Sequence, residues 1–249
     1  VIGTAGVLSA PADGYTFAVV FDTHGVNPAL NPNLPYDTKK DLTPLVLVGT
    51  SPMVLATHVG SEYKTFKDVM DAAKAKKNVS FGSIGNGSLG HLAMALLGKD
   101  ANVEWTHIPY KGAGPAVQDL MAGQVDIFIT TPASVIGQIK GDKLKALAVT
   151  SQTRLSALPN VATASEQGIK NFNLDSWFAL YAPAGTPPDV IRKVNAEVNK
   201  ILARPDIQKK AEDSGTFVEQ MTPAQLATFT KKEFDFWGKV IQNASITAE

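Results

Sequence analysis

The chain has 249 residues, of which 44% are apolar and 18% are charged, and this balance suits one large domain or two smaller lobes. Lysine and arginine together equal aspartate and glutamate at 23 each, so no overall charge attracts nucleic acid or an anionic membrane surface. The sequence has no cysteine, which excludes disulfides, thiolate metal sites and cysteine nucleophiles, and no apolar run approaches the ~20 residues that span a bilayer.

Hydrophobic patterning up to Thr150 predicts an alternation of buried strands and amphipathic helices. Fully apolar runs, bounded by turn residues such as Pro11–Gly14, are typical of strands that are buried on both faces. Strands are expected at 15–21, 44–48, 53–58, 79–81, 103–108, 125–129 and 146–150. Apolar residues recur at helical spacing in 66–75, 88–97, 112–122 and 133–140. This rhythm favours an α/β fold with mostly parallel sheets.

The pattern changes after Thr150. Residues 151–172 lack periodicity and are predicted to form a linker, and an apolar strand is expected at 176–182. Pro188 and Asp189 favour the start of a helix that runs to Leu202. A last amphipathic helix is expected from Thr222 to about Asn243.

The most informative segment is 79–98, where a strand, a glycine-rich loop and a helix opening at Ser88 follow one another. Glycine lets the backbone approach a ligand closely, and the first N–H groups of a helix lack intrahelical partners at the positive end of its dipole. We therefore expect the backbone around residues 83–88, the glycine loop, to hold an anion. The candidate ligand-binding residues here are Ser83, Gly85, Asn86, Gly87, Ser88 and His91. The alternative is a tight turn that binds nothing.

Three further loops follow predicted strands and carry polar groups. Ligands bind at the carboxyl ends of parallel strands, so we expect these loops to contribute to the same site. Their candidate ligand-binding residues are Lys111 and Gly112, then Thr131, and then Thr23, His24 and Asn27. The alternatives are a solvated lysine, a threonine that caps a turn and a structural histidine.

The glycine loop also matches the dinucleotide pattern G-x-G-x-x-G, as Gly85-Asn-Gly87-Ser-Leu-Gly90, which makes an NAD-linked or other anion-binding enzyme the competing class. That class needs an acidic residue at the far end of the next strand, whereas Asp100 and Glu104 precede it, so the placement of Glu104 discriminates. No zinc spacing of histidines, G-x-S-x-G elbow or phosphate loop is found, so we expect no catalytic residue, no metal and no cofactor. A third class is an interaction module without a ligand.

Several segments, in this order, resemble the solute-binding proteins of tripartite tricarboxylate transporters, the Bug-type receptors. They are Ala12–Thr16, Thr23–Pro28, Gly82–Leu92, Pro109–Ala116, Asp119–Asp126, Leu147–Ser151 and Trp177–Pro187. The resemblance implies a two-lobed periplasmic binding protein of type II, not an enzyme, whose lobes close on a ligand in a central cleft. The ligand would be a small carboxylate, such as a dicarboxylate, an acidic amino acid or an aromatic acid.

The resemblance also implies how the chain is divided. Lobe one would hold 1–58 and 171–249, and lobe two would hold 59–170. Asp175 would lie beside the second crossing between the lobes and, with Thr23 and Thr131, would select ligand length and any amino group. Members of the family commonly carry Asp-Asn where this chain has Thr130-Thr131.

The expected partners are the integral membrane permease subunits of the transporter, and the receptor is expected to be monomeric and periplasmic. In the family a strand and a Pro-Gly-Gly loop precede the position of Val1, so this sequence is expected to be a processed or trimmed product that starts after them.

Overall fold

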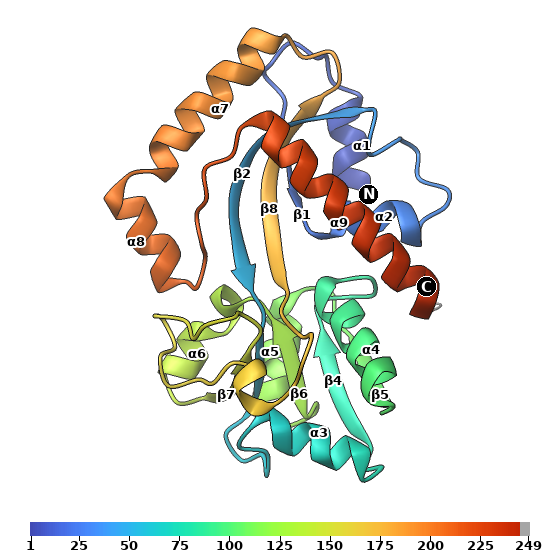
Figure 1. Cartoon of the computed structure of the whole chain (residues 1–249), viewed down its shortest axis with the longest axis vertical. Helices are drawn as coiled ribbons and strands as arrows, with labels where there is room; N and C mark the ends of the chain where they lie inside the picture. The colour runs from blue at the N-terminus through green and yellow to red at the C-terminus, as the bar shows by residue number, and fades with distance from the viewer. Residues whose placement is uncertain (245–249) are drawn as a thin grey trace. The chain divides into compact units, whose positions relative to one another are not determined.

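The computed structural model describes residues 1–244, which form two compact units that alternate along the chain. Unit 1 contains Val1–Thr50, Trp177–Ala211 and the described residues from Phe217 onward, and unit 2 contains Ser51–Ser176 and Glu212–Thr216. Each unit has its own sheet (Figure 1). In the described part of the chain, no helix combines the length and the hydropathy that a membrane crossing requires.

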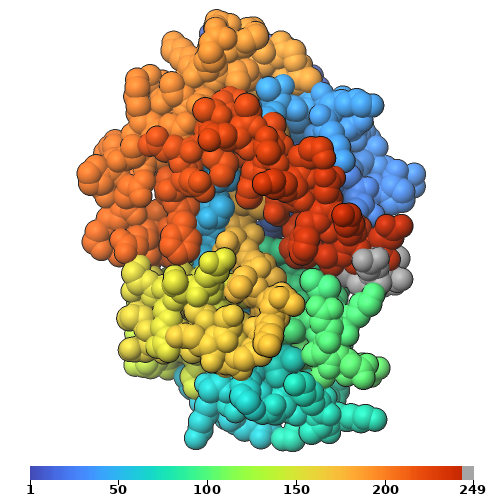
Figure 2. Space-filling view, in the orientation of Figure 1, coloured from blue at the N-terminus to red at the C-terminus, as the bar shows by residue number. Residues whose placement is uncertain are grey.

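Unit 1 is built on a three-stranded sheet in the order β1 (Ala18–Phe21), β8 (Asp175–Pro183), β2 (Leu42–Pro52). Strand β1 pairs antiparallel with β8, so that Ala18 lies opposite Tyr181. The helices of this unit are α1 (Ile2–Leu8), α2 (Thr23–Leu30), α7 (Pro188–Leu202), α8 (Pro205–Asp213) and α9 (Pro223–Ala244). Helices α7, α8 and α9, orange to red, occupy most of the face of unit 1 that Figure 2 shows.

The core of unit 1 includes Trp177 of β8, which is fully buried. Its ring meets Phe229 of α9 edge-on, at 5.8 Å between centroids. The indole nitrogens of Trp177 and Trp237 both donate to one carboxylate oxygen of Glu233, each at 3.2 Å. One acid thus satisfies two indole donors that would otherwise be buried without partners.

Unit 2 is built on a five-stranded sheet in the order β5 (Trp105–Pro109), β4 (Val79–Ser83), β6 (Ile127–Thr130), β3 (Val54–His58), β7 (Leu144–Val149). Strand β4 is parallel to β5 and β6, whereas β3 is antiparallel to β6 and β7. The helices are α3 (Phe66–Lys74), α4 (Leu89–Ala101), α5 (Ala113–Met121) and α6 (Ile136–Lys140), with short 3₁₀ turns η1 (Pro132–Ser134) and η2 (Ser165–Gln167). The expectation of mostly parallel strands therefore holds for β5, β4 and β6 but not for β3, which is antiparallel to both neighbours, or for the β1–β8 pair. Apolar runs alone carry no information on strand direction, so the sequence did not reveal this.

The chain passes from unit 1 to unit 2 between Thr50 and Ser51 and back between Ser176 and Trp177, and the short segment Glu212–Thr216 belongs to unit 2 again. The sequence analysis assigned residues 51–58 to lobe one, whereas the structure has them in unit 2, because β3 pairs with β6 and β7. Residues 171–176 move to unit 2 in the same way, since Phe172 packs on Phe66 with ring centroids 5.6 Å apart.

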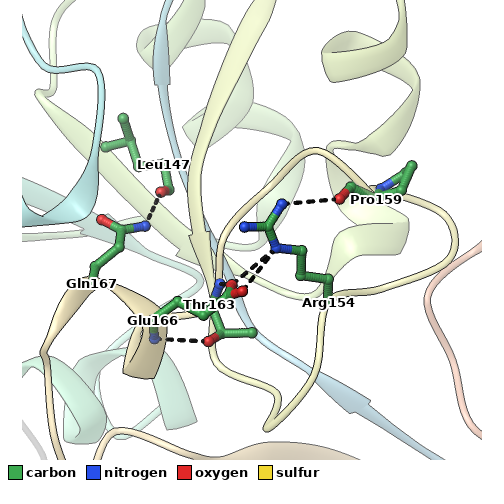
Figure 3. Close-up of polar contacts among 6 residues, drawn as sticks. All are labelled: Leu147, Arg154, Pro159, Thr163, Glu166 and Gln167. Atoms are coloured by element: carbon green, nitrogen blue, oxygen red, sulfur yellow. Dashed lines mark hydrogen bonds and ion pairs between the residues drawn. The ribbon is translucent and has the colours of Figure 1, made fainter.

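The predicted linker lies on the surface of unit 2, where it is yellow in Figure 2, and polar side chains hold it in place. Figure 3 shows Arg154, whose Nε lies 3.1 and 3.0 Å from the two carboxylate oxygens of Glu166 and whose Nη1 donates to the carbonyl of Pro159. On the other side, Gln167 donates to the carbonyl of Leu147 on β7 at 2.8 Å. Side-chain hydrogen bonds thus fix a segment that has almost no regular secondary structure of its own.

Candidate functional site

The glycine loop joins the carboxyl end of β4 to the start of α4. Ser83 ends the strand, and Ser88 is the N-cap of the helix, where its hydroxyl accepts from the backbone N–H of His91 at 3.4 Å. Gly85 and Gly87 have φ angles of 144° and 72°, which side chains with a Cβ rarely adopt. The predicted strand, loop and helix start at Ser88 are confirmed, and the backbone path explains the two glycines.

Several polar groups of the loop are bonded within it. The Gly85 N–H donates to the Ser83 hydroxyl at 3.2 Å, and the Ser88 N–H donates to the Gly85 carbonyl at 3.2 Å. The Gly87 N–H donates to Nδ1 of His91 at 3.1 Å. These three amides therefore have internal acceptors in the loop as it stands, and the expectation that the backbone around residues 83–88 holds an anion stays a prediction. Within residues 1–244, the N–H groups of Leu89 and Gly90 in the first turn of α4 have no such acceptor.

Two histidines, His91 and His107, make hydrogen bonds to the glycine loop. The His107 ring lies between Phe81, at 4.7 Å and 19°, and His91, at 4.0 Å and 8°. Strand register brings this about, since Phe81 on β4 is paired with His107 on β5. His107 also contacts the Ser83 hydroxyl through Nε2 at 2.7 Å. The sequence prediction named His91 but missed His107, whose role depends on the pairing of two strands.

Both imidazoles are neutral near pH 7. Burial, and then the charge of His91, lower the pKa of His107 to about 4, and burial lowers the pKa of His91. Because Nδ1 of His91 accepts from Gly87, the proton of the neutral ring lies on Nε2. The Ser83 hydroxyl lies 3.0 Å from the Gly85 carbonyl and has one hydrogen to donate, so donation there makes Nε2 of His107 the donor to Ser83.

The loop between β5 and α5 lies beside the glycine loop. Tyr110 N–H donates to the carbonyl of Ser83 at 3.0 Å, and Gly112 N–H donates to the carbonyl of Ile84 at 3.2 Å. Gly112 thus uses its amide to join the two loops rather than to offer it to a ligand. Lys111 is exposed at this junction and supplies a positive charge.

Thr131 and Asp175 are the other candidates in unit 2. Thr131 follows β6 and caps η1, and its carbonyl accepts from the N–H of Ser134 at 3.1 Å. Asp175 is the first residue of β8, and desolvation raises the pKa of its carboxyl group. Both stay predictions as ligand contacts.

The candidates in unit 1 lie on α2 rather than in a loop. His24 is only 3% exposed and packs against Tyr181, Phe234 and Trp177 at 4.7, 5.9 and 6.4 Å between ring centroids. Burial lowers its pKa to about 4. The expectation of a ligand-facing His24 is therefore wrong. Helix α2 begins at Thr23, so His24 lies in its first turn, and its ring packs in the core. Thr23 and Asn27 are half-buried and stay predictions.

Glu104 does not supply the acid that a dinucleotide site requires. It precedes β5, whose Trp105 pairs with Val79, whereas the glycine loop follows Ser83, which pairs with Pro109. Four residues of strand, about 13 Å, separate the two ends. The geometry therefore argues against the NAD-linked alternative.

The chain matches the family model described as the tripartite tricarboxylate transporter family receptor over residues 1–246. It is 37% identical to the UPF0065 protein in the tcbD-tcbE intergenic region of a Pseudomonas species, over 100% of this chain and 74% of the relative. It is 33% identical to protein BugT of Bordetella pertussis, over 97% of this chain and 75% of the relative.

Three solved structures show the same fold. MatC from Rhodopseudomonas palustris with bound malate has a TM-score of 0.87 at 30% identity, covering 96% of this chain and 83% of that chain. An R. palustris protein with adipate has a TM-score of 0.92 at 28% identity, covering 99% and 83%. The periplasmic binding protein BugD has a TM-score of 0.90 at 29% identity, covering 100% and 84%. The predicted fold of an α/β periplasmic binding protein is confirmed.

Proposed function

The chain belongs to the tripartite tricarboxylate transporter receptor family, and from that premise we propose that it captures a small carboxylate in the periplasm for an integral membrane permease. The observation that carries the proposal is the glycine loop at the start of α4, with positive φ at Gly85 and Gly87. A turn of this kind presents backbone donors at the positive end of a helix.

The donors that the loop offers a carboxylate follow from its internal bonds. The first-turn amides of Leu89 and Gly90 have no internal acceptor in the described chain, and Lys111 adds a positive charge beside the loop. The solved relatives with malate and adipate support a carboxylate as the ligand class. In this proposal the protein recognises its ligand and does no chemistry on it, and units 1 and 2 serve as its two lobes.

A thermal-shift screen against dicarboxylates, acidic amino acids, aromatic acids and NAD tests the proposal. A ligand at about 100 times its dissociation constant stabilises the folded chain by about 2.7 kcal/mol. Stabilisation by a carboxylate supports the receptor. Stabilisation by NAD alone supports the NAD-linked enzyme instead. If no compound stabilises the chain, the result favours an interaction module without a ligand.

The screen gains a site-specific control from two glycines. In the Gly87→Ala variant a Cβ strains the backbone at a φ of 72°, so we expect weaker binding of the carboxylate. The Gly114→Ala variant changes a glycine of α5 with open space around it and ordinary φ, and should bind as the wild type does.

A further inference from the structure

The glycine loop has an internal stand-in for an anion. Nδ1 of His91 accepts the hydrogen bond of Gly87 N–H at 3.1 Å, at the amino end of α4, where an anionic ligand would accept it. A ligand oxygen and the imidazole therefore compete for one backbone donor. This competition decides whether the Gly87 amide is open to a ligand.

Protonation of His91 ends that competition. An imidazolium has hydrogens on both nitrogens and accepts no hydrogen bond, so Gly87 N–H loses its internal acceptor. A positive ring at the positive end of a helix is unfavourable by itself, and a bound carboxylate offsets that repulsion. Ligand and proton thus favour one another at this loop.

The two stacked histidines compete for one proton. His107 stacks on His91 with ring centroids 4.0 Å apart, so a charge on one ring disfavours a charge on the other. Burial lowers the pKa of both rings. A carboxylate bound at the Gly87 amide lies beside His91, whose Nδ1 shares that amide, so the ligand favours the proton on His91 before His107.

The other titratable groups of the neighbouring elements in unit 2 leave this order unchanged. Asp119 of α5 accepts from the Tyr110 hydroxyl at 2.9 Å, and Asp126, before β6, accepts from Ser80 at 2.6 Å. Neither carboxylate contributes to the pKa of His91 or His107. The remaining charged side chains on these elements are Lys67, Asp68, Asp71 and Lys74 on α3, Lys99 and Asp100 on α4, Glu104 before β5, and Lys111.

We propose that His91 is a proton-linked positioning residue for the glycine loop, which holds Gly87 N–H in the free protein and releases it to a carboxylate ligand with uptake of one proton. The inference rests on the proposed function and adds its regulation: affinity for the carboxylate rises as the pH falls. In an acidified periplasm the receptor binds more tightly than at neutral pH.

The first experiment needs no ligand. Amide NMR of the full chain follows Gly87 through an acid titration, alongside the imidazole signals of His91. We expect the Gly87 resonance to move with the midpoint of His91 and to stay still in His91→Asn, whose side-chain oxygen accepts the same bond without titrating. A Gly87 resonance that ignores the protonation of His91 overturns the proposal, whatever the protein binds.

The second experiment measures binding of adipate and of malate at about pH 8 and about pH 6 by calorimetry, in buffers with different ionisation enthalpies. We expect wild-type affinity to be several-fold higher at the lower pH, with net proton uptake; one proton that is fully coupled over both pH units would give about a hundredfold, which is the upper bound. His91→Asn should lose this dependence, and comparison with it cancels the ionisation of the ligand itself.

Two matched variants separate His91 from the other histidines. His107→Gln keeps a donor for Ser83 and should retain the pH dependence. His58→Gln alters a histidine at the opposite end of the sheet, since Val54 and not His58 is paired with Thr130, and should retain it too. Equal pH dependence in wild type and His91→Asn overturns the inference but leaves the proposed function intact. Failure of every carboxylate to bind at either pH refutes the proposed function, and the amide titration then still decides whether the internal bond responds to the proton.

Discussion

Two histidine environments, one buried around His24 and one half-buried around His91 and His107, differ in what a neutral ring contacts. In unit 1, His24 lies among Tyr181, Phe234 and Trp177, and its Nε2 has no hydrogen-bond partner within residues 1–244. In unit 2, His91 and His107 are also kept neutral by burial, but each bonds to the glycine loop. A lowered pKa therefore does not identify a functional histidine; the group that its nitrogen contacts does.

The largest effect is expected for His24, the histidine in the core of unit 1. The pKa of His24 is lowered from 6.5 to about 4, so below pH 6.5 the unfolded chain binds a proton that the folded chain excludes. Stability should be full above about pH 6.5 and fall by about 3 kcal/mol as the pH drops to about 4. Urea unfolding across this range measures the loss. In His24→Phe the free energy of unfolding should fall less between pH 6.5 and pH 4, by about the same 3 kcal/mol. An equal fall in both proteins would show that His24 is not buried as the neutral ring.

The Ser83→Ala variant tests the histidines that bond to the glycine loop. The serine is fully buried, and its loss leaves Gly85 N–H and His107 Nε2 without their partner. We expect a loss of about 2 kcal/mol in the free energy of unfolding. Exposed Ser165→Ala is the control and should be within about 0.5 kcal/mol of wild type. Equal stability of the two variants would mean that the histidines do not depend on Ser83.

The Gly87→Ala variant tests the backbone conformation of the glycine loop. A Cβ at a φ of 72° costs about 1–2 kcal/mol of folding free energy. Thermal or chemical unfolding of this variant beside Gly114→Ala, which lacks that strain, gives the difference. A loss in both variants, or in neither, would contradict the loop geometry.

The smallest effect is expected at the helix cap. Ser88 accepts from the N–H of His91, and Ser88→Ala should cost about 1 kcal/mol, whereas Ser88→Asp should retain the cap. Because Ser88 also precedes the first free amides of α4, carboxylate affinity in the aspartate variant should fall through charge repulsion. Unchanged affinity would place the ligand away from this helix start.

Local chemistry made part of this structure predictable. The start of α4 at Ser88 followed from a capping residue after glycines, and the start of α7 at Pro188 followed from Pro188-Asp189. Positions that depend on distant residues were missed. The direction of β3 and the change of unit at Thr50 depend on pairing with β6 and β7, far along the chain.

The candidate site divides in the same way. The sequence identified the glycine loop, because glycines and a cap lie together in the chain. It could not show that His91 occupies the Gly87 amide, nor that His107 stacks beneath it, since both depend on side-chain placement and strand register. His24 was misassigned because a polar residue after a strand was taken for a loop residue, whereas α2 already starts at Thr23.

The interleaving of the two units has a consequence for biosynthesis. Nearly all of unit 2, Ser51–Ser176, is one continuous stretch, whereas unit 1 needs its first 50 residues and those from Trp177 onward. On the ribosome the five-stranded sheet can therefore assemble while β1 and β2 still wait for β8. In the sheet of unit 1, β1 and β2 pair with β8 across a sequence separation of more than a hundred residues. Pairing over such a separation is slow, so we expect this sheet to form last.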